Sequence, residues 1–135
     1  MSVTLTDQDK LNLRTAAYGA VALMAAVDGT GKPHRIATDG SIALSSATGL
    51  VGHVLTDYPK GSDLVGNSVA ELADRVLPTL TGAMILLKKQ DPAEADNFRS
   101  TVIVAIEAAT RTYKGKPTPT MADMTRKITQ ALDAA

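Results

Sequence analysis

Cysteine and tryptophan are absent from the 135-residue sequence, and the aromatic residues are one phenylalanine and three tyrosines. Without cysteine the chain has no disulfide, no thiolate metal site and no cysteine nucleophile. Hydrophobic residues still make up 44% of the chain, so a core is built mainly from Ala, Leu, Val, Ile and Met. Ala, Leu and Met favour helix because they lose little rotamer freedom there.

Neither sign of charge predominates, because 14 basic residues are balanced by 14 acidic ones. Nucleic-acid binding relies on clustered Lys and Arg, or on aromatic platforms for single strands, so we expect no nucleic-acid partner. The longest apolar run, residues 16–27, is shorter than the roughly 18 residues of a membrane span, so we expect no membrane partner. The first ten residues lack the pattern of a signal peptide, and we expect a cytoplasmic protein.

Helix start signals occur at four places along the chain. Each is a polar N-cap residue followed by an acid or a proline in the first turn. The cap residues are Thr6, Ser68, Asp91 and, for the last helix, Thr118 or Thr120. Apolar residues at helical spacing follow each start, which predicts helices from near residues 7, 69, 92 and 119.

Two of these predicted helices have a distinctive sequence feature. The first is apolar nearly all round from Leu11 to Val27, which is typical of a helix surrounded by others, so we expect it to be central. The helix that follows Ser68 contains Pro78. Because proline removes an amide donor and clashes with the preceding turn, we expect that helix to kink or to divide.

Residues 32–67 allow two interpretations. Pro33 can open a helix that runs through Ala47, yet Asp39-Gly40 lies between apolar residues, which is the signal of a small hairpin near residues 35–44. A short helix from Leu50 to Thr56 follows either element. The fold class predicted is therefore all-α: a compact single domain, residues 1–135, of about five to six helices.

An internal pseudo-repeat is a further possibility. Residues 13–15 (Leu-Arg-Thr) align with residues 98–100 (Phe-Arg-Ser) at an offset of 85, and both helices precede a Gly-Lys-Pro segment. The same pattern also arises by coincidence between Ala-rich helices with ordinary stops.

The two histidines are the strongest candidates for chemistry. Imidazole and carboxylate groups suit zinc or a similar divalent metal, and the candidate ligands are Asp28, His34, Asp39 and His53. The same histidines with nearby carboxylates could serve a small hydrolase. No motif places them together, and the alternative is that they are ordinary polar residues of an irregular segment. We predict no cofactor, with a divalent metal as the one open case.

Met121 and Met124 begin the last predicted helix. Methionines more often fill gaps in a core than form a binding surface. An exposed pair at these two positions would instead indicate a partner-binding site.

One stretch, Asp28-Gly29, ends the central Ala-rich helix, and another, residues 91–99, opens an acid-capped helix that precedes a Pro-Thr-initiated last helix. This order resembles TerB-like proteins, the compact helical domains associated with tellurite resistance. The resemblance implies a helical fold and a metal role for acidic residues around the Asp-Gly turns, where Asp28 matches the first position. The second turn reads Tyr113-Lys114-Gly115 in place of Asp-Gly.

The leading functional hypothesis is a non-enzymatic helical module that binds a protein partner or a copy of itself. The alternative is a small metal-dependent or hydrolytic enzyme that uses His34, His53 and nearby carboxylates. An enzyme requires these groups to converge in a pocket, whereas a binding module requires exposed apolar surface.

Overall fold

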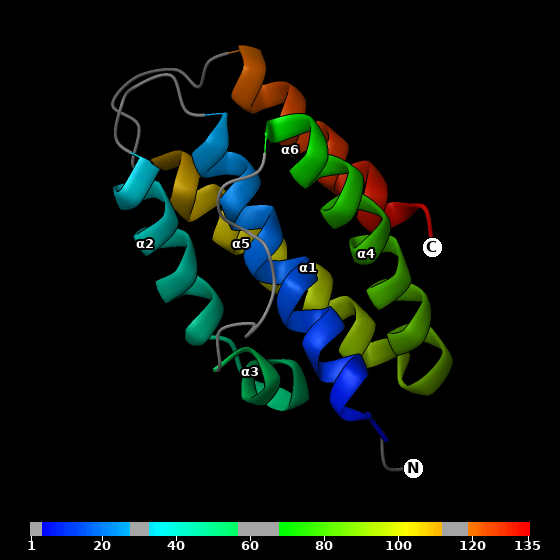
Figure 1. Cartoon of the computed structure of the whole chain (residues 1–135). Coiled ribbons are helices and arrows are strands. Elements are labelled where there is room, and N and C mark those ends of the chain that lie inside the picture. The colour runs from blue at the N-terminus through cyan, green and yellow to red at the C-terminus, as the bar shows by residue number, and fades with distance from the viewer. Residues whose placement is uncertain (1–3, 28–32, 57–67, 112–118) are drawn as a thin grey trace.

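The computed structural model of the protein describes residues 4–27, 33–56, 68–111 and 119–135. These segments are helical almost throughout and contain no strand, which confirms the predicted all-α bundle (Figure 1). The helices are α1 (Asp7–Ala26), α2 (Pro33–Ser45), α3 (Gly49–Leu55), α4 (Val69–Gln90), α5 (Pro92–Arg111) and α6 (Pro119–Asp133).

The predicted first cap is present in full. The Thr6 hydroxyl accepts a hydrogen bond from the Asp9 amide at 3.0 Å, and the Asp9 carboxylate accepts one from the Thr6 amide at 3.0 Å. At the start of α4 the Ser68 hydroxyl accepts from the Glu71 amide at 3.2 Å. These side chains satisfy amides that the first turn of a helix leaves without an internal partner.

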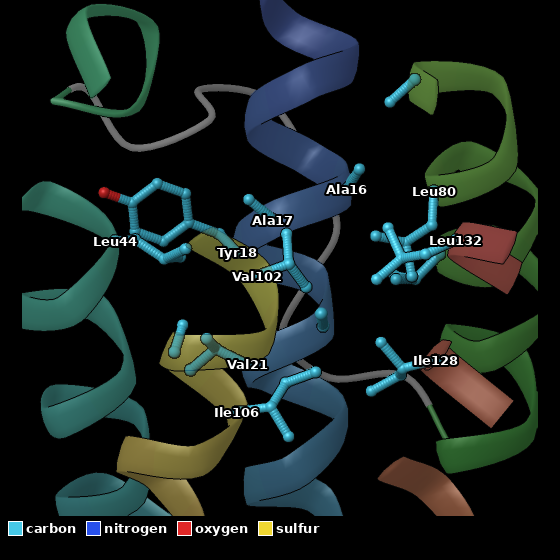
Figure 2. Packing of buried hydrophobic residues seen from close by; sticks show 14 of the residues in the cluster. Ala16, Ala17, Tyr18, Val21, Leu44, Leu80, Val102, Ile106, Ile128 and Leu132 are labelled. Atoms are coloured by element: carbon cyan, nitrogen blue, oxygen red, sulfur yellow. The ribbon is translucent and has the colours of Figure 1, made fainter. Parts of the chain in front are cut away.

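Helix α1 is central, as its all-round apolar pattern predicts. It contacts each of the other five helices. Figure 2 shows Leu44 of α2 on one side of α1 and Leu80 of α4 on the other, and both leucines are fully buried. From Leu13 to Met24, no residue of α1 is exposed.

Residues 33–45 form a helix, so the hairpin is not the structure adopted there. Asp39 and Gly40 lie inside α2, where Gly40 is buried against α1. A Cβ atom on Gly40 would lie only 2.6 Å from Cγ1 of Val21. The glycine therefore serves close packing of two helices rather than a turn.

A second glycine brings α1 close to α4. A Cβ atom on Gly19 would lie 2.5 Å from Cγ2 of Val76, which is a β-branched and fully buried side chain. A valine in a helix has essentially one rotamer, so it has little freedom to move away. The α1–α4 contact thus depends on the missing side chain at Gly19.

Pro78 does not divide α4, which is one continuous helix across it. Because proline has no amide hydrogen, the Asp74 carbonyl has no donor within the helix. Both residues are exposed, so water can donate the missing hydrogen bond. The apolar residues at helical spacing in α4 face the core, and Leu72, Val76, Leu80, Met84 and Leu87 are buried. Val69 is the exception at 36% exposed, because it lies in the first turn of the helix.

Helix α5 begins and ends 85 residues after α1 does, which is the offset of the possible repeat. The Gly-Lys-Pro segments themselves lie outside the described residues or at their edge. Arg99 of α5 donates hydrogen bonds to Asp133 of α6 at 2.8 and 3.3 Å, and this contact lowers the pKa of the Asp133 carboxyl. Both side chains are substantially exposed, so the ion pair contributes little to stability.

We expect Gly19→Ala to lower the free energy of unfolding by about 1 to 3 kcal/mol, because its Cβ overlaps Val76. Gly82→Ala is the matched control, since a Cβ atom there meets nothing within 4 Å. It should raise that free energy by up to about 1 kcal/mol through helix propensity. Urea denaturation at low protein concentration measures both, and equal effects of the two substitutions would contradict the packing account.

Candidate functional site

The two histidines predicted for a metal or hydrolytic site lie on different helices. His34 is in the first turn of α2, and His53 is exposed in the last turn of α3. A 13-residue helix is about 20 Å long, and α3 lies beyond the end of α2 that is far from His34 (Figure 1). The fold thus gives the two residues no common helical face.

The carboxylates of that hypothesis are also separated from a shared centre. Asp39 is half-buried on α2, whereas Asp28 and the side chain of His34 lie outside the described residues. Among the side chains that the structure describes, no group of three His, Asp or Glu residues is close enough to hold a metal ion. In this part of the chain, the structure thus shows no arrangement of side chains that supports a metal site or a hydrolytic site.

Met121 and Met124, the predicted partner-binding pair, are 0% and 5% exposed. Both lie on the face of α6 that packs into the core with Ile128 and Leu132. A partner site required an exposed pair, so the two methionines belong to the core instead. Their flexible thioether side chains fill space between helices.

The most elaborate polar contacts of the described residues hold the short helix α3. Its N-cap residue, Thr48, makes no side-chain capping bond. The Glu94 carboxylate of α5 caps the helix from outside: one of its oxygens accepts from the Leu50 amide at 2.8 Å and from the Val51 amide at 3.4 Å. A carboxylate at this end also complements the positive end of the helix dipole.

Side chains of α1 hold the opposite end of α3. Arg14 donates to the Val54 carbonyl at 2.8 Å, and the Tyr18 hydroxyl donates to the Leu55 carbonyl at 2.7 Å. These carbonyls belong to the last turn, where a helix leaves acceptors without an internal donor. A seven-residue helix is too short to be stable by itself, so α3 depends on contacts with α1 and α5.

Two glycines make this arrangement possible. Gly49 has a φ of +74°, a left-handed conformation that strains other residues, and it lies against Glu94. A Cβ atom on Gly52 would lie 2.1 Å from the Ala47 carbonyl oxygen. The chain between α2 and α3 can therefore turn tightly only with glycine at both positions.

A shallow groove lies beside this junction, between the C-terminal half of α2 and α5. Its volume is about 290 Å³, and its lining residues are Ala43, Ser46, Ala47, Thr48, Asn97, Ser100, Thr101 and Val104. None of them is charged. Asn97 donates to the Thr48 carbonyl at 2.9 Å, so a direct hydrogen bond joins α5 to the α2–α3 junction at one end of the groove.

Aliphatic side chains are exposed in and beside this groove. Val104, which lines it, is 50% exposed, and Ile42, which is 58% exposed, lies on α2 next to the lining residue Ala43. The groove was not predictable from the sequence, because Val104 stands between the buried residues Val102 and Ala105 in the chain and only the packing of α2 decides which face of α5 remains open. The signal in the sequence was Val104 itself, an aliphatic residue at a position that does not fit the helical spacing of the buried stripe of α5.

A second hollow lies between α1 and α4 and has a volume of about 280 Å³. Its polar residues already have partners within the chain. Asp9 accepts from the Thr6 amide, the Asn12 side-chain oxygen accepts from Gln8, and the Thr79 hydroxyl donates to the Arg75 carbonyl. The α2–α5 groove, with its exposed aliphatic groups, is therefore the stronger candidate site.

Comparison with protein-family models, with curated proteins and with solved structures found no match for the chain. The resemblance to TerB-like domains thus rests on the residues quoted above and stays a prediction. In the part of the chain that the structure describes, none of the helices combines the length and the apolar character that crossing a membrane requires.

We expect Glu94→Ala to lower the free energy of unfolding by about 0.5 to 2 kcal/mol, the usual effect of losing a helix cap. Amide hydrogen exchange should accelerate within α3 more than within α5, because the lost hydrogen bonds are those of Leu50 and Val51. Glu107→Ala, which removes an exposed carboxylate from the same helix, is the control. Unchanged exchange in α3 would show that the carboxylate does not hold this helix.

Proposed function

We propose that the protein is a non-enzymatic interaction module that binds a protein partner in the α2–α5 groove. The observation that carries this proposal is Val104, an aliphatic side chain left half exposed in a groove with no charged lining residue. Burial of apolar area contributes roughly 25 cal/mol per Å², so covering this side chain favours association.

The lining indicates the chemistry of the partner. A groove without charge offers no ion pair to a charged ligand, which would lose its hydration there. Hydroxyl and amide groups of Ser100, Thr101 and Asn97 border the apolar positions. We therefore expect the partner to present an uncharged protein segment whose aliphatic side chains meet Val104 and Ile42.

The contacts around α3 support the same proposal, because they make one end of the groove rigid. Thr48 and Asn97 line the groove and are joined by a hydrogen bond, and Asn97 also lies 3.4 Å from the capping carboxylate of Glu94. A preorganised surface loses less conformational entropy when it binds than a flexible one does.

A peptide-display selection on the purified chain tests this proposal. We expect the wild-type protein to select peptides rich in aliphatic residues, and we expect Val104→Lys to lose them, because the ammonium group would be desolvated in the groove. Ile85→Lys is the matched control, since Ile85 is 53% exposed on α4. Circular dichroism checks that both variants fold.

Selected peptides that bind wild type and Ile85→Lys equally, and Val104→Lys at least about tenfold more weakly, would support the groove. Peptides whose binding is indifferent to Val104→Lys, or a selection that yields none above background, would contradict it.

A further inference from the structure

The outer face of α4 carries a regular pattern of residues that remain exposed among the helices that the structure describes. Exposed residues recur along it at positions 71, 75, 78, 82, 85 and 89. The alternating intervals of four and three residues keep them on one stripe, as in the seam of a coiled coil. The residues of this outer stripe are Glu71, Arg75, Pro78, Gly82, Ile85 and Lys89.

Between Arg75 and Lys89 the outer stripe is uncharged. Ile85 is 53% exposed, and a Cβ atom added to Gly82 would meet nothing within 4 Å. Glycine inside a helix costs roughly 1 kcal/mol relative to alanine. At Gly19 and Gly40 close packing within the chain explains that cost, and at Gly82 no contact within the described residues does.

Other helices reach only the flanks of the outer stripe. On one flank α6 approaches, where the Thr81 hydroxyl donates to the Ala131 carbonyl at 2.6 Å and the Lys88 ammonium donates to the Ala135 carbonyl at 2.9 Å. On the other flank lies the hollow against α1, which Gly82 also lines. Figure 1 shows α4 along the outer side of the bundle.

The charges at the two ends of the outer stripe are complementary to each other. Glu71 lies in the first turn of α4 and Lys89 in the last. If two α4 helices pair in antiparallel orientation about a two-fold axis near Leu80, Glu71 of each copy lies opposite Lys89 of the other. Pro78 then faces Gly82, and Ile85 packs on the hydrocarbon stem of Arg75. Parallel pairing would instead oppose like charges.

We propose that a second copy of this chain docks on the outer stripe, with the two α4 helices antiparallel. Gly82 lets the two backbones approach closely, Ile85 loses its exposure, and two Glu71–Lys89 pairs select the orientation. The contact is isologous, so it closes at the dimer. An interface of one helix face is small, and we expect a dissociation constant in the micromolar range.

Sedimentation equilibrium of the full chain over a range of concentrations tests the proposal. We expect a monomer–dimer equilibrium for the wild type. Lys89→Glu should raise the dissociation constant by roughly tenfold, because each dimer would contain two repulsive carboxylate pairs. The double variant Glu71→Lys with Lys89→Glu should restore most of the affinity, since the charges are exchanged and the pairs re-form.

Gly82→Leu provides a second test that does not depend on charge. We expect it to abolish the dimer, because a bulky side chain holds the backbones apart, while circular dichroism stays that of a folded helical bundle. Val104→Lys should leave the equilibrium unchanged, which separates this surface from the α2–α5 groove. A wild type that is monomeric throughout, a double variant no tighter than Lys89→Glu, or a dimer lost in Val104→Lys would overturn the proposal.

Discussion

The close approach of other helices to α1 is the constraint on which the bundle depends. Large aromatic side chains are nearly absent, so interhelical space must be kept small enough for Ala, Val, Leu and Met to fill it. Gly19 and Gly40 achieve this at two contacts, one with Val76 of α4 and one with Val21 of α1. Packing at near-crystalline density leaves such positions little tolerance for an added methyl group.

The candidate binding surface follows from the position of α1. Its side chains Arg14 and Tyr18 hold the C-terminal end of α3, while Glu94 of α5 holds the N-terminal end. Since α2 also packs directly on α1, the α2–α5 groove is bordered by elements that share one support. The exposed residues that line this groove are Val104 and three hydroxyl residues, Ser46, Thr48 and Ser100.

Local chemistry made the helices predictable, and tertiary contacts made the site unpredictable. The Thr6 and Ser68 caps act within one turn of their own helix, so their residue types alone indicate the starts. Asp39-Gly40 also matched a hairpin turn, because the need for a small residue against Val21 arises only once α1 and α2 are packed. For Glu94, likewise, a first-turn acid of α5 was predictable, but its role in capping α3, more than 40 residues away in the chain, was not.

Amide hydrogen exchange of α1, measured by NMR together with urea denaturation, tests this account most directly. If every other helix depends on α1, the amides around Gly19 can exchange only when the whole bundle unfolds. Their opening free energy should then equal the global free energy of unfolding, and it should exceed that of α3. Opening of α1 at a clearly lower free energy than α5 would contradict the account, because the bundle would then persist without its central helix.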